Sequence, residues 1–414
     1  MPTFRMSRGA MLLAPIATAI ALLITPAAHA DDTVRSSEWP LDSDHFRAGD
    51  IWKLTRGDGV TVAVIDSGVA ADHPDLAGRV LPGTSLLGDR SGGNSDTSSD
   101  SHGTAIAGII AATGASQHGT GMTGLAPKAE ILPVRVTAGG SVTPGLLAQA
   151  ITWAADHGAS VINVSIGTTE PDALLHQAVT YALRKNVVVV ASAGNNGLDG
   201  NEPMYPAAFP GVVSVSGVDQ NGDFWENSER GHGTTVAAPA ADIASTNDQG
   251  HYVNADGTSY AAAYVSAAVA LVRSRYPHLT SGQVIRRLTA TAHRHHDAPD
   301  QQVGYGEIDP LGALTTTMDP GDAANPLLSA ASASSSQPHV VWRLVGLTGA
   351  ATAIFAAAAW LLLVRKRRAV AGPAPVHRFD RVAAGSGNNR KGTTRPTIKS
   401  QRRSSSKRPA SRAH

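Results

Sequence analysis

The chain has 414 residues, with 34 Lys and Arg against 33 Asp and Glu, and it contains no cysteine. The absence of cysteine excludes disulfide bonds, thiolate zinc sites and cysteine nucleophiles, and the length is ample for one large core with appendages. Charge is divided unevenly, because residues 31–340 carry 16 Lys and Arg against 32 Asp and Glu, whereas residues 365–414 carry 15 against one. The two ends are therefore expected to face different environments.

Residues 1–30 have the pattern of a secretory signal peptide. Arg5 and Arg8 precede an apolar run from residue 10 to residue 24, and Ala28-His29-Ala30 has the small-x-small form of a cleavage site. A retained membrane anchor is the alternative, but the apolar run is short for a bilayer span. We predict export of the chain, with a short polar N-terminal extension at residues 31–57.

Residues 58–318 alternate predicted strands and helices. The β-branched run at 59–68 is typical of a buried strand, and the segment at 84–101, rich in Gly, Ser, Asn and Asp, is expected to form a mobile surface loop. Further strands are expected at 131–136, 160–167, 186–193, 212–218 and 235–237, and helices at 105–112, 143–157, 171–185, 258–276 and 280–291. This order predicts an α/β fold, a doubly wound parallel sheet flanked by helices, with functional groups at the carboxyl ends of the strands.

Three polar residues of this region each allow a structural and a catalytic interpretation. Asp66 ends the first strand, where a carboxylate either binds turn amides or serves a site at the sheet edge. His102 begins a small-residue helix, where it is either a core or capping residue or a proton carrier. Ser259 lies in the first turn of an alanine-rich helix, either as an N-cap or as a nucleophile. Only their tertiary arrangement decides between these interpretations.

The C-terminal part predicts a membrane anchor. Residues 319–342 form a flexible linker rich in Ala and Ser, and residues 343–364 form a transmembrane helix. The 21 residues from 344 onward carry no charge and would extend about 31 Å as a helix, which also allows a buried core helix. The basic run directly after this span predicts a cytoplasmic C-terminus. The basic, disordered tail at 365–414 would contact anionic lipid rather than nucleic acid, the alternative partner of basic segments.

Four ordered blocks of the chain resemble the subtilisin-like serine proteases, or subtilases. They are the aspartate block Val62–Gly68 with His73-Pro74-Asp75-Leu76 behind it, the histidine block His102–Gly108, the segment Ala191–Asn195, and the serine block Gly257-Thr258-Ser259. The resemblance covers about residues 57–315. It implies a subtilisin-like α/β fold and a serine endopeptidase that needs neither a metal nor a cofactor.

The resemblance also implies a role for each residue of the site. Ser259 would be the nucleophile, His102 the general base and Asp66 the residue that orients the imidazole. The side-chain amide of Asn195 and the backbone N–H of Ser259 would form the oxyanion hole. The residues expected to bind the substrate backbone and to wall the P1 pocket are Ser165, Ile166, Gly167, Ala191, Ser192, Ala193 and Gly194.

Within this family the chain is similar to the mycosins, membrane-anchored subtilases of type VII secretion systems. The similarity rests on Trp39-Pro40-Leu41, on the block Gly57–Val64, on an N-terminal extension too short for a folded pro-domain, and on the single C-terminal span. It implies a single-pass protein of the cell membrane with an extracellular catalytic domain, acting on a protein or peptide and associated with secretion-complex subunits. The alternative is a structural subunit that stabilises such a complex and whose proteolysis is dispensable.

Overall fold

The structure is a computed structural model that describes residues 33–89, 92–116, 121–293, 299–328 and 360. At its centre lies a seven-stranded parallel sheet with the strand order β2-β3-β1-β4-β5-β6-β7. The strands are β1 (Thr61–Asp66), β2 (Thr84–Ser85), β3 (Glu130–Arg135), β4 (Val161–Val164), β5 (Val188–Ser192), β6 (Val213–Val218) and β7 (Val236–Pro239). The predicted parallel sheet is confirmed.

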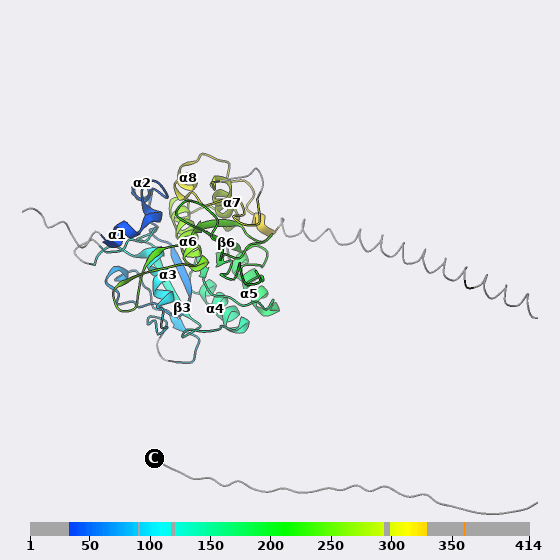
Figure 1. Ribbon diagram of the computed structural model, residues 1–414, viewed down its shortest axis with the longest axis horizontal. Coiled ribbons are helices and arrows are strands. Elements are labelled where there is room, and N and C mark those ends of the chain that lie inside the picture. The colour runs from blue at the N-terminus through cyan, green and yellow to red at the C-terminus, as the bar shows by residue number, and fades with distance from the viewer. Residues whose placement is uncertain (1–32, 90–91, 117–120, 294–298, 329–359, 361–414) are drawn as a thin grey trace, which may run out of the picture. The chain divides into compact units, whose positions relative to one another are not determined.

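Helices cover both faces of this sheet (Figure 1). α3 (His102–Ala111) and α6 (Thr258–Arg275) belong to the core on one face, and α4 (Pro144–Asp156) and α5 (Ala173–Arg184) to the core on the other. Alternate residues of β1 serve the two cores, Val62 and Val64 on the first and Ala63 and Ile65 on the second. A strand buried on both sides needs a continuous apolar run, which explains its sequence.

The alanine-rich helix α6 is enclosed along most of its length. It is buried from Thr258 to Val272 and contacts β4, β5, β6 and β7. Small side chains around the whole helix allow the sheet and α3 to pack closely against it. Its first turn is thereby held at the carboxyl edge of the sheet.

The strand order reverses between β1 and β4. From β1 the chain builds β2 and β3 on one side, then returns to place β4 and all later strands on the other. Ile65 of β1 pairs with Val164 of β4, so Asp66 and Ser165 leave the sheet side by side. Such a switch point is where open α/β sheets place their binding sites.

The N-terminal extension is folded, contrary to the expectation of a merely polar segment. It forms α1 (Thr33–Ser37), the 3₁₀ turn η2 (Trp39–Leu41) and α2 (Ala48–Leu54). Trp39, Phe46 and Ile51 are buried in the main core. The Glu38 carboxylate accepts a 2.7 Å hydrogen bond from the Thr123 N–H, and the Trp39 indole donates to the carbonyls of Ala241 and Asp242. Apolar residues scattered through a short segment give no periodicity, so the sequence pattern did not reveal them.

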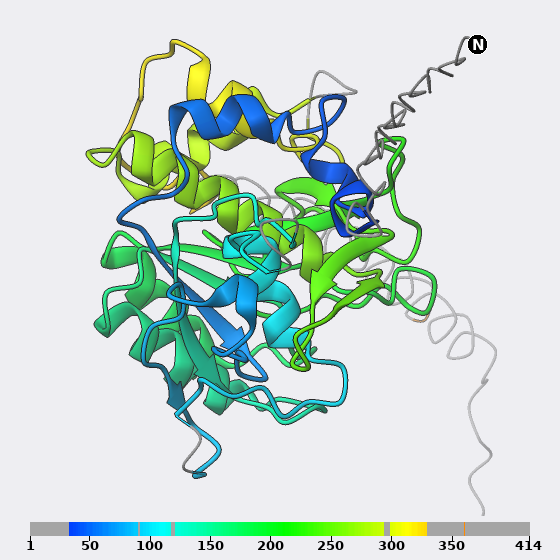
Figure 2. The same ribbon diagram turned by 90° about the vertical axis from the view of Figure 1, so that its left-hand side faces the viewer.

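The remaining elements close the domain. α7 (Ser281–Thr291) and α8 (Pro310–Thr315) lie beside the end of α6, and α2 contacts α8, as the dark blue and yellow ribbons of Figure 2 show. Another 3₁₀ turn, η3 (Pro74–Leu76), follows the turn after β1. An antiparallel hairpin, β8 (Ile243–Thr246) and β9 (Tyr252–Ala255), packs against α3 and was not predicted.

The membrane-related predictions fall on other parts of the chain. No helix within the described ranges is both long and apolar enough to cross a bilayer. The predicted signal peptide at 1–30, the tail at 365–414 and, apart from Trp360, the predicted span at 343–364 lie outside the described residues. The proposed domain boundaries therefore stay predictions.

Candidate active site

Asp66 and His102 are hydrogen-bonded at the switch point of the sheet. Asp66 is fully buried, and its Oδ1 lies 2.8 Å from Nδ1 of His102. The same oxygen accepts a 2.8 Å hydrogen bond from the Ser67 N–H, while Oδ2 has no hydrogen-bond partner among the described residues. The carboxylate thus binds the imidazole at Nδ1 and leaves Nε2 as the nitrogen available for proton transfer.

A glycine at the second position of α3 allows this contact. A Cβ on Gly103 would lie 2.1 Å from the Gly68 carbonyl oxygen and 3.2 Å from Cβ of Asp66. The Gly103 N–H donates a 2.9 Å hydrogen bond to Oγ of Ser67. The helix therefore begins in direct contact with the turn after β1, which brings His102 to Asp66.

The loop before α3 caps the helix and was expected to lie on the surface. Asp96 is instead buried, and its Oδ2 accepts hydrogen bonds from the N–H and the hydroxyl of Thr104 at 2.9 and 2.8 Å. The hydroxyl of Ser98, also buried, donates to Asp96, and its Oγ lies 3.1 Å from Oγ of Ser67. These bonds satisfy N–H donors at the start of the helix. The many short polar residues of the loop are compatible with such a capping role, but the sequence does not show which of them has it.

The surroundings of His102 favour its cationic form. Burial opposes protonation, but the charge of Asp66, its hydrogen bond, and the charges of Asp100 and Asp96 outweigh burial and raise the pKa of His102 to about 9. A carboxylate that stabilises the imidazolium is what a general base needs in order to accept a proton from a weak acid.

Ser259 is the second residue of α6. The ring of the next residue, Tyr260, has its centroid 6.2 Å from that of His102. The Ser259 hydroxyl donates a 2.9 Å hydrogen bond to the Ser165 carbonyl, and the Ser165 hydroxyl donates to the Ser259 carbonyl at 3.1 Å. No hydrogen bond joins His102 to Ser259 in the part of the chain that the structure describes. The hydroxyl is therefore directed at the end of β4.

Asn195 follows β5 and is tied to the residue before Ser259. Its Oδ1 accepts hydrogen bonds from the Thr258 N–H at 2.9 Å and from the Thr258 hydroxyl at 2.8 Å. With the oxygen occupied, the amide NH₂ of Asn195 remains as the donor. The Ser259 N–H belongs to the first turn of α6 and has no intrahelical acceptor. Two N–H donors thus flank the start of this helix.

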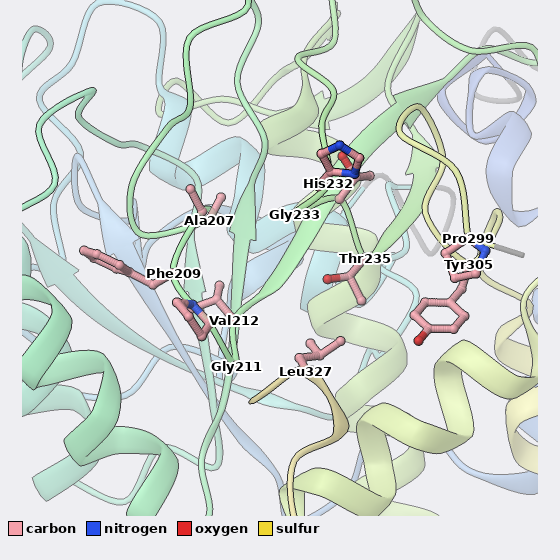
Figure 3. Close-up of a pocket in the computed structure, with 13 residues that line it drawn as sticks. Ala207, Phe209, Gly211, Val212, His232, Gly233, Thr235, Pro299, Tyr305 and Leu327 are labelled. Carbon is pink, nitrogen blue, oxygen red and sulfur yellow. The ribbon is translucent and has the colours of Figure 1, made fainter. Parts of the chain in front are cut away.

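The residues expected to bind substrate lie directly after β4 and at the end of β5 and just beyond it. Ser165, Ile166 and Gly167 leave the sheet at the switch point, next to α6. In the second group, Ala191 is only 1% exposed and packs into the core, so it supports the segment from within, whereas Ser192 and Gly194 are half-buried. A separate pocket, of about 210 Å³, is lined largely by residues that precede β6 and β7. In Figure 3, Ala207, Phe209 and Val212 lie on one side of it and Tyr305 on the other.

A second pocket, of about 340 Å³, borders the second of these segments. Its lining includes Ala193 and also Met204 and Tyr205. A Cβ on Gly167 would lie 2.8 Å from the Tyr205 carbonyl oxygen and 3.0 Å from Cε of Met204. The pocket shares Ala207, Ala208, His232, Gly233 and Thr234 with the one in Figure 3. Its volume is in the range typical of ligand sites.

Glu229 also lines this pocket, although no sequence pattern pointed to it. It lies in the loop between β6 and β7, far along the chain from every motif of the site, and it is 4% exposed. A buried acid is recognised as unusual only after its burial is known. Among the described residues, no cluster of three or more His, Asp or Glu is arranged to hold a metal ion.

Comparison with known proteins identifies the class. The model of the subtilase family of peptidases matches residues 57–306. The chain belongs to the subtilase family of serine endopeptidases, as the sequence blocks predicted. Thermitase from Thermoactinomyces vulgaris is 40% identical over 231 residues, which cover 56% of this chain and 80% of thermitase.

Within the family the chain is similar to mycosins. Mycosin-3 from Mycobacterium tuberculosis strain H37Rv is 35% identical over 343 residues, covering 66% of this chain and 72% of mycosin-3. The solved structure of MycP1, described as a serine protease and an essential component of the type VII (ESX-1) secretion system, matches with a TM-score of 0.59 and 36% identity. That match covers 67% of this chain and 88% of MycP1. The predicted resemblance to mycosins is confirmed.

Proposed function

We propose that Asp66, His102 and Ser259 form the catalytic triad of this endopeptidase. The observation that carries the proposal is the 2.8 Å hydrogen bond between Asp66 Oδ1 and His102 Nδ1, made beside the first turn of α6. The bond leaves Nε2 of His102 as the base. A single rotation about χ1 of Ser259 changes which neighbour its hydroxyl faces, and hydrogen bonds of catalytic groups often form only with substrate bound.

The chemistry then follows from the groups present. His102 removes the proton of the Ser259 hydroxyl as Oγ attacks the scissile carbonyl, and Asp66 stabilises the resulting imidazolium. The negative charge on the carbonyl oxygen is stabilised by the Asn195 amide and the Ser259 N–H. His102 next protonates the leaving amine, and water hydrolyses the acyl-enzyme by the same proton path in reverse.

The substrate of this mechanism is a protein or peptide in an extended conformation. The segments Ser165–Gly167 and Ser192–Gly194 both contact the first turn of α6, through Ser259 and Thr258 respectively, and offer backbone groups for strand-like pairing. They place the scissile carbonyl between Asn195 and Ser259. The pocket beside Ala193 receives the side chain that precedes the scissile bond.

The cellular setting is a proposal from the sequence and from the relatives. The signal-peptide pattern, the uncharged run at 344–364 and the basic residues after it support a single-pass membrane protein with an extracellular catalytic domain and a cytoplasmic tail. The similarity to MycP1, an essential component of a type VII system, supports association with subunits of such a membrane complex. The basic tail would contact anionic lipid rather than nucleic acid.

A fluorophosphonate probe tests the triad in the full-length chain. We expect the probe to label the wild type and to label neither Ser259→Ala nor His102→Ala, because only an activated serine reacts. Thr258→Ser, which keeps the hydroxyl that bonds Asn195, is the control and should retain labelling. A folded wild type that fails to react would contradict the proposal.

The same Ser259→Ala variant separates proteolysis from a structural role. If catalysis is the function, cells that carry the variant lose cleavage of the substrate while the membrane complex still assembles. If secretion and assembly are both unchanged in the variant but lost on deletion of the chain, the structural subunit is the correct interpretation.

A further inference from the structure

The carboxylate of Glu229 is a buried charged group that the proposed triad does not use. Its Oε1 receives one long hydrogen bond, 3.4 Å, from the Asn196 amide. Its Oε2 has no hydrogen-bond partner among the described residues, and none of their ion pairs includes Glu229. A buried carboxylate without partners destabilises a fold unless something else binds it. Its position therefore points to a ligand.

The position of this carboxylate links it to the site. A Cβ on Gly194 would lie 2.5 Å from the carboxyl carbon of Glu229, and the Glu229 N–H donates a 2.9 Å hydrogen bond to the Gly194 carbonyl. Gly194 has φ of +118°, a conformation that glycine adopts without strain. The acid thus packs directly under the residue before Asn195 and lines the pocket next to Ala193.

The charges around the pocket favour a cation. Burial raises the pKa of Glu229, the Asn196 hydrogen bonds oppose this, and the nearby charge of Glu202 adds to it, for a pKa of about 7. Arg230 also lines the pocket, but its guanidinium lies over the ring of Phe224, 5.8 Å from the ring centroid. A bound ammonium or guanidinium would pair with the carboxylate and favour its ionised form.

We propose that Glu229 determines specificity by selecting a Lys or Arg side chain at P1, the residue before the scissile bond. The proposal rests on the proposed function, because it assumes that the segment ending at Asn195 borders the scissile carbonyl. The aliphatic stem of such a side chain passes between Ala193 and Met204, and its charged end pairs with the carboxylate of Glu229. An apolar P1 residue leaves the buried acid unpaired, which disfavours it.

Peptides that differ only at P1 test the proposal with the full-length chain. We expect the wild type to cleave after Lys or Arg with kcat/KM about tenfold or more above that for Leu. Glu229→Gln, which keeps the shape and removes the charge, should lower the Lys-to-Leu ratio about 30-fold. Glu202→Gln, at an exposed neighbouring acid, is the control and should change the ratio by less than about threefold.

Two outcomes would overturn the proposal. One is a wild type that prefers Leu or Gln at P1, which decides the question even if Glu229→Gln does not fold. The other is an unchanged Lys-to-Leu ratio in folded Glu229→Gln. Fluorophosphonate labelling of Ser259 distinguishes failure of the Glu229 proposal from failure of the triad proposal. Labelling without a preference for Lys or Arg at P1 contradicts only the role of Glu229. Absence of labelling contradicts the triad and, with it, this inference.

Discussion

Asp66 and Glu229 are both buried carboxylates at the same edge of the sheet, but their surroundings differ. Asp66 lies 2.8 Å from an imidazole nitrogen and also accepts the Ser67 N–H. Among the described residues, Glu229 accepts hydrogen bonds only from Asn196, a neutral residue. In the first region the counter-charge is built into the fold, whereas in the second it would come with the substrate. From this contrast we infer different roles for the two acids: Asp66 takes part in the reaction itself, and Glu229 selects the substrate.

The largest effect on kcat is expected when the hydrogen-bonded pair of Asp66 and His102 is broken. Asp66→Asn should lower kcat by about 10⁴-fold, because the amide can neither stabilise the imidazolium nor hold the useful tautomer. Steady-state cleavage of one peptide measures this. Asp242→Asn, at an exposed aspartate of the hairpin region, should keep kcat within about twofold. A decrease in kcat of less than about tenfold for Asp66→Asn would contradict a catalytic role for the Asp66 carboxylate.

Removal of the neutral Asn195 amide should lower kcat less than removal of the Asp66 charge. Asn195→Ala should reduce kcat by about 10²–10³-fold with little change in KM, because the amide acts on charge that develops only in the transition state. The matched control is Asn254→Ala, whose amide bonds Asp242 away from the site. An equal rise in KM with unchanged kcat would assign Asn195 to ground-state binding instead.

Two glycines, each the second residue of its helix, test how closely α3 packs against the turn after β1. Gly103 is the second residue of α3 and meets the Gly68 carbonyl, while Gly145 is the second residue of α4 and has open space around its Cβ position. Gly103→Ala should lower the free energy of unfolding by about 1–3 kcal/mol, and Gly145→Ala should raise it by up to about 1 kcal/mol. Urea denaturation measures both. Equal stability of the two variants would contradict close contact between α3 and the turn after β1.

The smallest effect concerns the acids around the imidazole. Because the pKa of His102 is raised to about 9 and the base must be neutral, kcat/KM should increase as pH rises through this range. Asp100→Asn removes an exposed charge that favours the imidazolium, so it should move this increase to lower pH by less than about one unit. Asp72→Asn is the control, and an unmoved profile for both variants would exclude Asp100 as a contributor.

The same shift has a consequence for stability. A histidine whose pKa is higher in the folded state than its ordinary value of 6.5 stabilises the fold fully below that value. This contribution is lost as pH rises through about 9. Chemical denaturation at pH 6 and pH 10 should therefore show a smaller pH-dependent loss for His102→Gln than for the wild type.

Much of the site could be predicted because its residues lie within local patterns. The apolar run before Asp66 predicted a strand that ends at the sheet edge, and the small residues after His102 and Ser259 predicted helices that begin there. The loop up to Ser101 and the N-terminal extension were predicted less well. Their contacts, such as Asp96 with Thr104 and Trp39 with the carbonyl of Ala241, join residues that no periodic pattern relates.

By itself, the sequence determined the alternation of strands and helices, the family, and the identity of the residues proposed for the triad, because periodicity and ordered blocks are properties of neighbours along the chain. Only the tertiary structure decided that Asp66 faces His102, that Thr258 orients Asn195, and that Glu229 is buried under Gly194. Burial and pairing depend on which distant segments of the chain contact each other. Glu229 is a candidate for determining substrate specificity because its loop packs against Gly194 and buries its carboxylate; its residue type alone would predict a place on the surface.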